Sequence, residues 1–243
     1  SKIAVARVRG FQGDDLTATN TIAACAKHLA GYGFAEAGRD YNTVDFGTST
    51  LYNMVLPPFK AAADAGVQTF MNAFNILNGV PATGNAFLQR DILKGEWDFD
   101  GFVVSDWGSV GEMISHGFAS DSTHAAVLAA NAGSDMDMES YAYVNYLEPM
   151  VKAGKVDEAK IDEAVRRILR VKFRLGLFDD PYKYCDEERE EELLYKPEHQ
   201  AVALDIAKKS IVLLKNEGDL LPLSKTQKNI AVIGELADDK DSP

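Results

Sequence analysis

Gly101-Phe102-Val103-Val104-Ser105-Asp106-Trp107-Gly108 is the stretch that decides the fold. Its continuous apolar run, residues 102–104, is typical of a strand buried on both faces within a parallel sheet. The polar residues that follow lie where such a strand meets solvent, and in α/β barrels the reactive side chains lie at that end. Asp106 is therefore a candidate catalytic nucleophile. The alternative is an Asp that caps the following helix or turn, and the local sequence favours neither.

Composition narrows the class of protein. The chain has 243 residues, of which 46% are hydrophobic, and a net charge of −12, which argues against nucleic acid and anionic membranes as partners. No apolar stretch approaches the roughly 18–20 residues of a transmembrane helix. Residues 1–6 lack the apolar core of a secretory signal. Cys25 and Cys185 are far apart, which predicts free buried thiols rather than a disulfide framework.

Strand patterns alternate with helical patterns along most of the chain. Besides 101–104, strands are predicted at 21–26, 66–74 and 134–138, and helices at 51–65, 85–93, 122–132, 143–153 and 157–175. Pro57 and Pro58 must break or kink the first of these helices. This order predicts an α/β fold in which four strand-helix units make about half of a (β/α)8 TIM-type barrel.

Three segments are expected. Residues 1–177 form the half-barrel, 178–226 form a linker with a helix at 197–214, and 227–243 begin a second domain with a strand at 229–234. Half a barrel leaves two open sheet edges, so we expect this chain to be a fragment of a longer protein.

Reactive or apolar side chains follow three predicted strands, and we expect them to line one depression at the carboxyl end of the barrel sheet. They are Lys27-His28, Met71 to Phe74, and Asp106-Trp107. Sugars need directional donors and acceptors together with an aromatic face, and this set supplies both. The alternative is an exposed Lys27 and a structurally bonded His28. The four histidines have no metal-ligand spacing, so neither a metal nor a cofactor is expected.

These residues also resemble glycoside hydrolase family 3, and the similarity covers nearly the whole chain. The motifs that carry it occur in the family's order: 27–33, 71–75 with 78–81, 101–108, 174–178, 210–216 and 230–234. The bacterial periplasmic β-glucosidases of the family are the most similar branch. The resemblance implies that residues 1–177 are the second, C-terminal half of the (β/α)8 barrel and that residues 227–243 begin an α/β-sandwich domain.

The resemblance also implies a role for each matching residue. Asp106 matches the nucleophile that forms the glycosyl-enzyme intermediate of a retaining mechanism. Lys27 and His28 match a pair that binds sugar hydroxyls, and Met71 matches an apolar contact in the same subsite. Trp107 matches a residue that helps to form the sugar pocket.

This sequence departs from the family pattern at Phe74, which is tyrosine in many members, so a polar role there is in doubt. A retaining glycosidase needs a second carboxyl group about 5 Å from the first. In the family's β-glucosidases it is a glutamate on the second domain. We therefore expect this segment alone to be inactive and to need the missing barrel half and second domain. The β-N-acetylglucosaminidase branch is disfavoured because Tyr32 stands where that branch has histidine.

The expected activity is that of a retaining, exo-acting β-glycosidase that hydrolyses terminal β-D-glucosyl residues of β-glucosides and oligosaccharides. The alternatives are a β-xylosidase or α-L-arabinofuranosidase of the same family, or a non-catalytic carbohydrate-binding protein. The resemblance implies a periplasmic or secreted location and allows a homodimer of the full enzyme. Asp135 and Asp137, after the last predicted barrel strand, are either pocket-wall residues or helix caps and surface residues.

Overall fold

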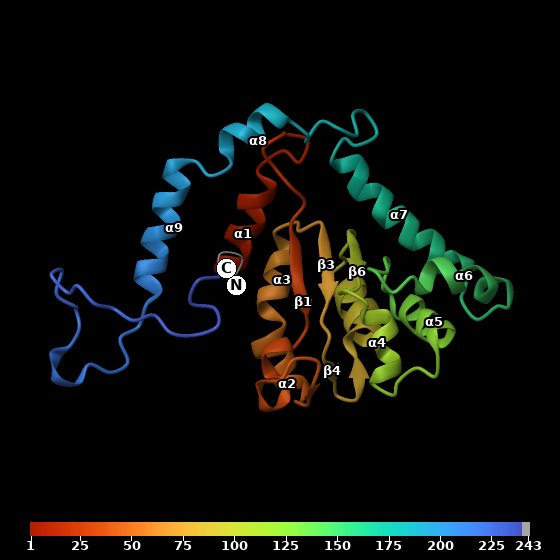
Figure 1. Ribbon diagram of the computed structural model, residues 1–243. Coiled ribbons are helices and arrows are strands. Elements are labelled where there is room, and N and C mark those ends of the chain that lie inside the picture. The colour runs from red at the N-terminus through yellow and green to blue at the C-terminus, as the bar shows by residue number, and fades with distance from the viewer. Residues whose placement is uncertain (240–243) are drawn as a thin grey trace. The chain divides into compact units, whose positions relative to one another are not determined.

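A computed structural model describes residues 1–239, and the chain divides into two compact units after Cys185. The first unit is built on a parallel sheet in the order β1 (Cys25–Leu29), β3 (Thr69–Asn72), β6 (Phe102–Val104), as Figure 1 shows. The register pairs Phe70 with Val103, so the carboxyl ends of the two strands lie side by side. The predicted α/β class with parallel strands is confirmed.

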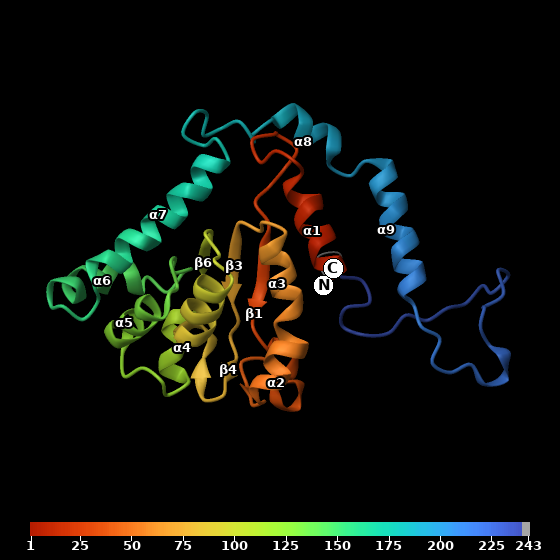
Figure 2. The same cartoon turned by 180° about the vertical axis from the view of Figure 1, so that it is seen from behind.

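In Figure 2, α3 lies beside β1 at one edge of this sheet, and α4 and α5 lie toward the opposite edge, near β6. The helices of the first unit are α1 (Lys2–Gln12), α2 (Thr48–Thr50), α3 (Pro57–Asp64), α4 (Ser109–Ser115), α5 (Ser122–Ala132), α6 (Ala142–Lys152) and α7 (Glu158–Arg174). Two π-helical segments, η3 (Leu51–Val55) and η5 (Phe87–Glu96), stand where α-helix was predicted. The break at the prolines is confirmed, because α3 begins at Pro57, where a missing N–H costs nothing.

A second, smaller sheet lies past the carboxyl ends of the first. It consists of β2 (Thr43–Val44), β4 (Ile76–Leu77) and β5 (Val80–Pro81); β2 and β4 are parallel, and β4 and β5 form an antiparallel hairpin. Asn78, at the turn of the hairpin, donates from its side chain to Phe46 O and accepts from Phe46 N. This ties the loop after β2 to the loop after β3.

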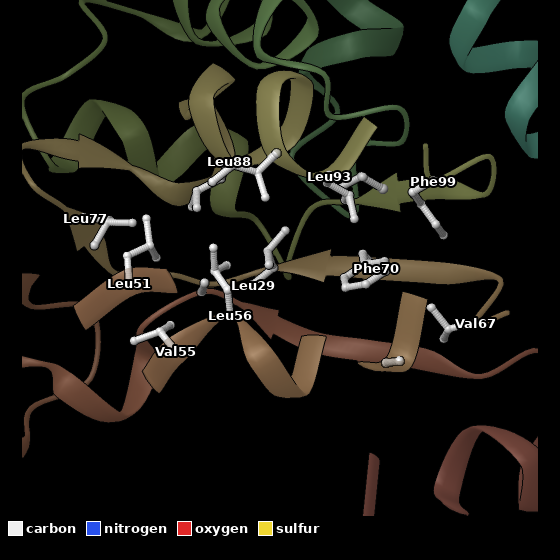
Figure 3. Packing of buried hydrophobic residues seen from close by; sticks show 14 of the residues in the cluster. Leu29, Leu51, Val55, Leu56, Val67, Phe70, Leu77, Leu88, Leu93 and Phe99 are labelled. Carbon is white, nitrogen blue, oxygen red and sulfur yellow. The ribbon is translucent and has the colours of Figure 1, made fainter. Parts of the chain in front are cut away.

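The main core lies between the parallel sheet and the helices that cover it (Figure 3). Phe70 of β3 is fully buried at its centre and meets Phe99 edge to face, with 4.9 Å between the ring centroids. Leu29 of β1 and Leu93 of η5 are also fully buried. This packing fixes the positions of the strands whose ends carry the candidate site.

The predicted strand at 134–138 is reduced to a single bridge between Val104 and Met136. The cause is Asp135, whose carboxylate Oδ2 accepts from Val103 N at 2.8 Å and so takes the place of a backbone carbonyl. The first predicted strand, which begins at residue 21 and ends at the Lys27-His28 pair, is displaced, since β1 begins at Cys25 and continues past that pair to Leu29. The peptide bonds Lys27–His28 and Leu29–Ala30 are cis.

The first unit extends to Cys185, past the predicted boundary at residue 177. Tyr184 holds this extension, because its hydroxyl donates to the backbone oxygens of Leu16 and Leu175. Both cysteines are free, as predicted, but they are exposed and not buried. Cys25 opens an edge strand, where only one side of the backbone is covered.

The second unit contains α8 (Glu187–Leu193) and α9 (Pro197–Ser210). The predicted strand at 229–234 is wrong for the described chain. Ile230, Val232 and Ile233 are exposed, and no strand is assigned between residues 186 and 239. An extended segment becomes a strand only when a neighbour satisfies its backbone groups, and this segment has none there. The last four residues of the predicted 227–243 segment lie outside the described residues.

Candidate active site

Asp106 lies two residues past the end of β6 and is 8% exposed. Its carboxylate Oδ1 accepts from Trp107 N at 2.7 Å. Ser105 locks the turn, because its hydroxyl donates to Asp106 O at 2.9 Å and accepts from Met138 N at 2.8 Å. Gly108, with a φ of 68°, precedes α4 and occupies its N-cap position. The Asp106 side chain is therefore not the cap of α4.

His28 faces Asp106 from β1. Its Nε2 lies 3.3 Å from Asp106 Oδ2, but the contact is not aligned as a hydrogen bond, and Oδ2 is buried without one among the described residues. Burial lowers the pKa of His28 more than the carboxylate of Asp106 raises it. The imidazole is thus neutral at pH 7, able to donate one hydrogen bond while Asp106 Oδ2 keeps a free lone pair.

The other predicted residues lie around this pair. Lys27 is exposed, with its Nζ 3.9 Å from Met71 Sδ, so β1 and β3 bring these two side chains together. Phe74, two residues past β3, is half-buried in a group of aromatic rings. Trp107 is 62% exposed, and its ring makes no aromatic contact within residues 1–239. The structure thus brings together His28 with Asp106 and Lys27 with Met71, and leaves the indole at the surface.

An aromatic wall, formed by Tyr32, Tyr41 and Phe74 beside His28, was not predicted. The ring centroids are 5.0 Å apart for His28 and Tyr32, 6.4 Å for Tyr32 and Phe74, and 4.5 Å for Tyr41 and Phe74. Burial, and after it the neighbouring carboxylate of Asp40, raise the pKa of the Tyr32 hydroxyl. The sequence feature that could have indicated this wall is the position of residues 30–42 in a loop that follows a predicted strand, because binding residues are often found in such loops.

A second carboxyl group, that of Glu112 on α4, was also missed. Its Oε2 is buried and has no hydrogen-bond partner in the described part of the chain. Burial raises the pKa of Glu112, and the carboxylates of Asp106 and Asp40 raise it further. A lone Glu within a short helix gives no sequence signal of this kind, because its neighbours come from distant loops.

The two remaining carboxylates have structural partners. Asp135 is buried and pairs with Lys94 at 2.7 Å. Asp137 Oδ2 accepts from Ala142 N at 2.8 Å and from Tyr143 N at 3.2 Å, so Asp137 caps the start of α6. The capping interpretation thus fits Asp137, and Asp135 is neither a cap nor exposed.

Buried acceptor atoms without partners gather at this end of the sheet. Among residues 1–239 they are Asn72 Oδ1, Asn75 Oδ1, Asp106 Oδ2, Glu112 Oε2 and Asp137 Oδ1. Buried polar atoms in folded proteins nearly always have a partner, and all of these are oxygens that need a donated proton. Hydroxyl groups or water supply such protons. The described residues include no cluster of histidine, cysteine and carboxylate side chains suited to a metal ion.

Comparison with known proteins gives the family. Residues 1–171 match the glycosyl hydrolase family 3 N terminal domain, and residues 211–242 match the C-terminal domain of the same family. The chain therefore belongs to glycosyl hydrolase family 3, a family of glycoside hydrolases.

The individual relatives that this chain resembles have the names of glycosidases. A periplasmic beta-glucosidase of Salmonella typhimurium is 42% identical over 234 residues, which are 95% of this chain and 30% of the relative. A beta-xylosidase of Formosa agariphila is 39% identical over 249 residues, 98% of this chain and 34% of the relative. The crystal structure of a beta-glucosidase from Listeria innocua in complex with isofagomine matches with a TM-score of 0.82 and 42% identity, over 92% of this chain and 32% of that one. The chain spans about a third of the length of these relatives.

No helix within residues 1–239 combines the length and the apolar character that a membrane crossing requires.

Proposed function

We propose that the protein containing this chain is a retaining, exo-acting β-glucosidase with Asp106 as its nucleophile. Asp106 Oδ2 attacks the anomeric carbon and forms a glycosyl ester, while the bond from that carbon to the leaving oxygen breaks. An acid protonates the leaving oxygen, and water then hydrolyses the ester. The observation that carries the proposal is the buried Oδ2 of Asp106, which has no hydrogen bond and lies 3.3 Å from His28 Nε2.

Neighbouring side chains have matching roles in this proposal. His28 and Lys27 donate to hydroxyl groups of the terminal sugar, Met71 supplies an apolar contact, and Trp107 and Phe74 add aromatic surface. A glutamate of the C-terminal domain, which the family resemblance implies, acts as the acid and base. Binding by donors and aromatic faces, without a metal, suits a neutral polyol.

The proposal also includes the fold of the longer protein. The parallel sheet belongs to a (β/α)8 barrel of which residues 1–177 are the C-terminal half, 178–226 are a linker, and 227–243 begin an α/β-sandwich domain. A periplasmic or secreted location is supported by the name of the Salmonella typhimurium relative.

A panel of 4-nitrophenyl glycosides tests the substrate class. In the full-length protein, kcat/KM for the β-D-glucoside should exceed that for the β-D-xyloside by at least about tenfold, because a pocket built for the extra CH₂OH group loses its contacts when that group is missing. The name of the Formosa agariphila relative favours the β-D-xyloside as the second candidate substrate. A faster β-xyloside or α-L-arabinofuranoside would replace the β-glucosidase assignment. If sugars bind and none of the panel is hydrolysed, the protein is a carbohydrate-binding protein instead.

A further inference from the structure

Tyr41 is held in a conformation that its bulk disfavours. Its φ is 64°, in the left-handed region that large side chains rarely adopt. The backbone around it is pinned: Tyr41 N donates to Asp40 Oδ1 at 2.9 Å, and Asn42 Nδ2 donates to Glu36 O at 3.2 Å. Strain of this kind persists where the surroundings enforce it, which is common in ligand clamps. The backbone at Tyr41 is therefore held by contacts within the loop itself.

The small second sheet determines where this ring lies. Thr43 of β2 pairs with Ile76 of β4, so the residues two positions before each of them are brought near each other. Tyr41 and Phe74 are those residues, and their ring centroids are 4.5 Å apart. Phe74 supports one side of Tyr41, and 43% of Tyr41 remains exposed. An exposed aromatic ring with a rigid support is a ready surface for a flat apolar group.

Tyr41 also lies within electrostatic reach of the candidate nucleophile. Besides burial, the carboxylates of Glu112, Asp40 and Asp106 raise the pKa of the Tyr41 hydroxyl. The rings of His28, Tyr32 and Phe74 form a continuous series of contacts between the two residues. Asp106 is 8% exposed at one end of this series and Tyr41 is 43% exposed at the other, so we place Asp106 at the floor of the site and Tyr41 at its rim. In an exo-acting enzyme the terminal sugar reaches the floor and the leaving group remains at the rim.

We propose that Tyr41 is the stacking surface for the leaving group of the substrate, a second sugar or an aryl ring, and thereby sets the preference for it. This inference rests on the proposed function. The apolar C–H face of the ring packs on the exposed side of Tyr41.

The test compares two substrates in the full-length protein. A β-linked glucose disaccharide has a second ring, whereas β-D-glucosyl fluoride has none. Tyr41→Asn removes the aromatic ring and suits a positive φ, because asparagine tolerates the left-handed region well. It should lower kcat/KM for the disaccharide by about 10- to 50-fold and leave that for the fluoride within about twofold. Tyr41→Phe keeps the ring and should retain most of the disaccharide activity.

Tyr195→Asn is the matched control, since Tyr195 also has a positive φ, 55°, and is 83% exposed in the second unit. This variant should leave kcat/KM unchanged for both substrates. Equal losses on both substrates, or no loss on the disaccharide, would overturn the role of Tyr41. Failure of the proposed function looks different, because the unmodified protein would then hydrolyse neither substrate.

Discussion

Asp106→Asn should abolish turnover, with kcat/KM on an aryl β-glucoside reduced by about 10⁴-fold or more, as when the nucleophile of other covalent enzymes is removed. An amide is a poor nucleophile and cannot form the glycosyl ester. The fold should persist, because asparagine keeps the oxygen that accepts from Trp107 N. The measurement is steady-state hydrolysis by the full-length protein, alongside a thermal melt of both variants.

Asp64→Asn provides the matched control, since Asp64 is an exposed aspartate at the end of α3. It should leave hydrolysis unchanged. Asp106→Gly adds a second arm, because azide can fill the vacated space and attack in place of the carboxylate. An α-configured glycosyl azide should then form. Wild-type turnover by Asp106→Asn would show that another group performs the attack.

Lys94→Met should destabilise the fold by about 3–5 kcal/mol, the cost of leaving a buried charge unpaired. The side chains of Lys94 and Asp135 are 6% and 3% exposed, and their charged atoms are 2.7 Å apart. Lys94 Nζ also donates to Gly133 O at 2.8 Å. Burial lowers the pKa of Lys94 and raises that of Asp135, and their mutual contact opposes both shifts. Urea unfolding at pH 7, followed by circular dichroism, measures the loss.

Two variants separate this effect from a general loss of packing. Lys60→Met breaks an exposed pair with Asp64 and should cost less than about 1 kcal/mol. Asp135→Asn added to Lys94→Met removes the stranded charge and should restore part of the stability, since an amide oxygen can still accept from Val103 N. The cost of Lys94→Met should also shrink in acid, because protonation neutralises a carboxyl whose folded pKa is raised. A cost no larger than that of Lys60→Met would contradict the buried-pair account.

The strand that leads to Asp106 could be predicted because its signal is local. Its apolar run ends at the polar residues Ser105 and Asp106. The parallel pairing of β3 with β6 follows from the alternation of strands and helices along the chain. The position of β1 was less accurate, since Lys27 and His28 lie inside the strand. A hydrophobic pattern predicts only the buried part of a strand. Residues at its end that are exposed or half-buried follow no such pattern, so the end of the strand is not predicted.

The aromatic wall could not be predicted because non-local pairing creates it. Tyr41 meets Phe74 only when β2 pairs with β4, and strands of two residues have no periodicity to detect. Glu112 likewise acquires its environment from Asp106 and Asp40, which are distant in the chain. The prediction of a strand at 229–234 was wrong for a related reason. An apolar run indicates burial, but a strand also requires a neighbouring strand to pair with.

The central claim is that Asp106 becomes covalently glycosylated, and mechanism-based labelling tests it most directly. The full-length protein is incubated with a 2-deoxy-2-fluoro-β-glucoside bearing a good leaving group, digested, and mapped by mass spectrometry. The account predicts that the peptide containing Asp106 gains one 2-deoxy-2-fluoroglucosyl group while activity is lost in step. A label on a different carboxylate of an inactivated enzyme would contradict it.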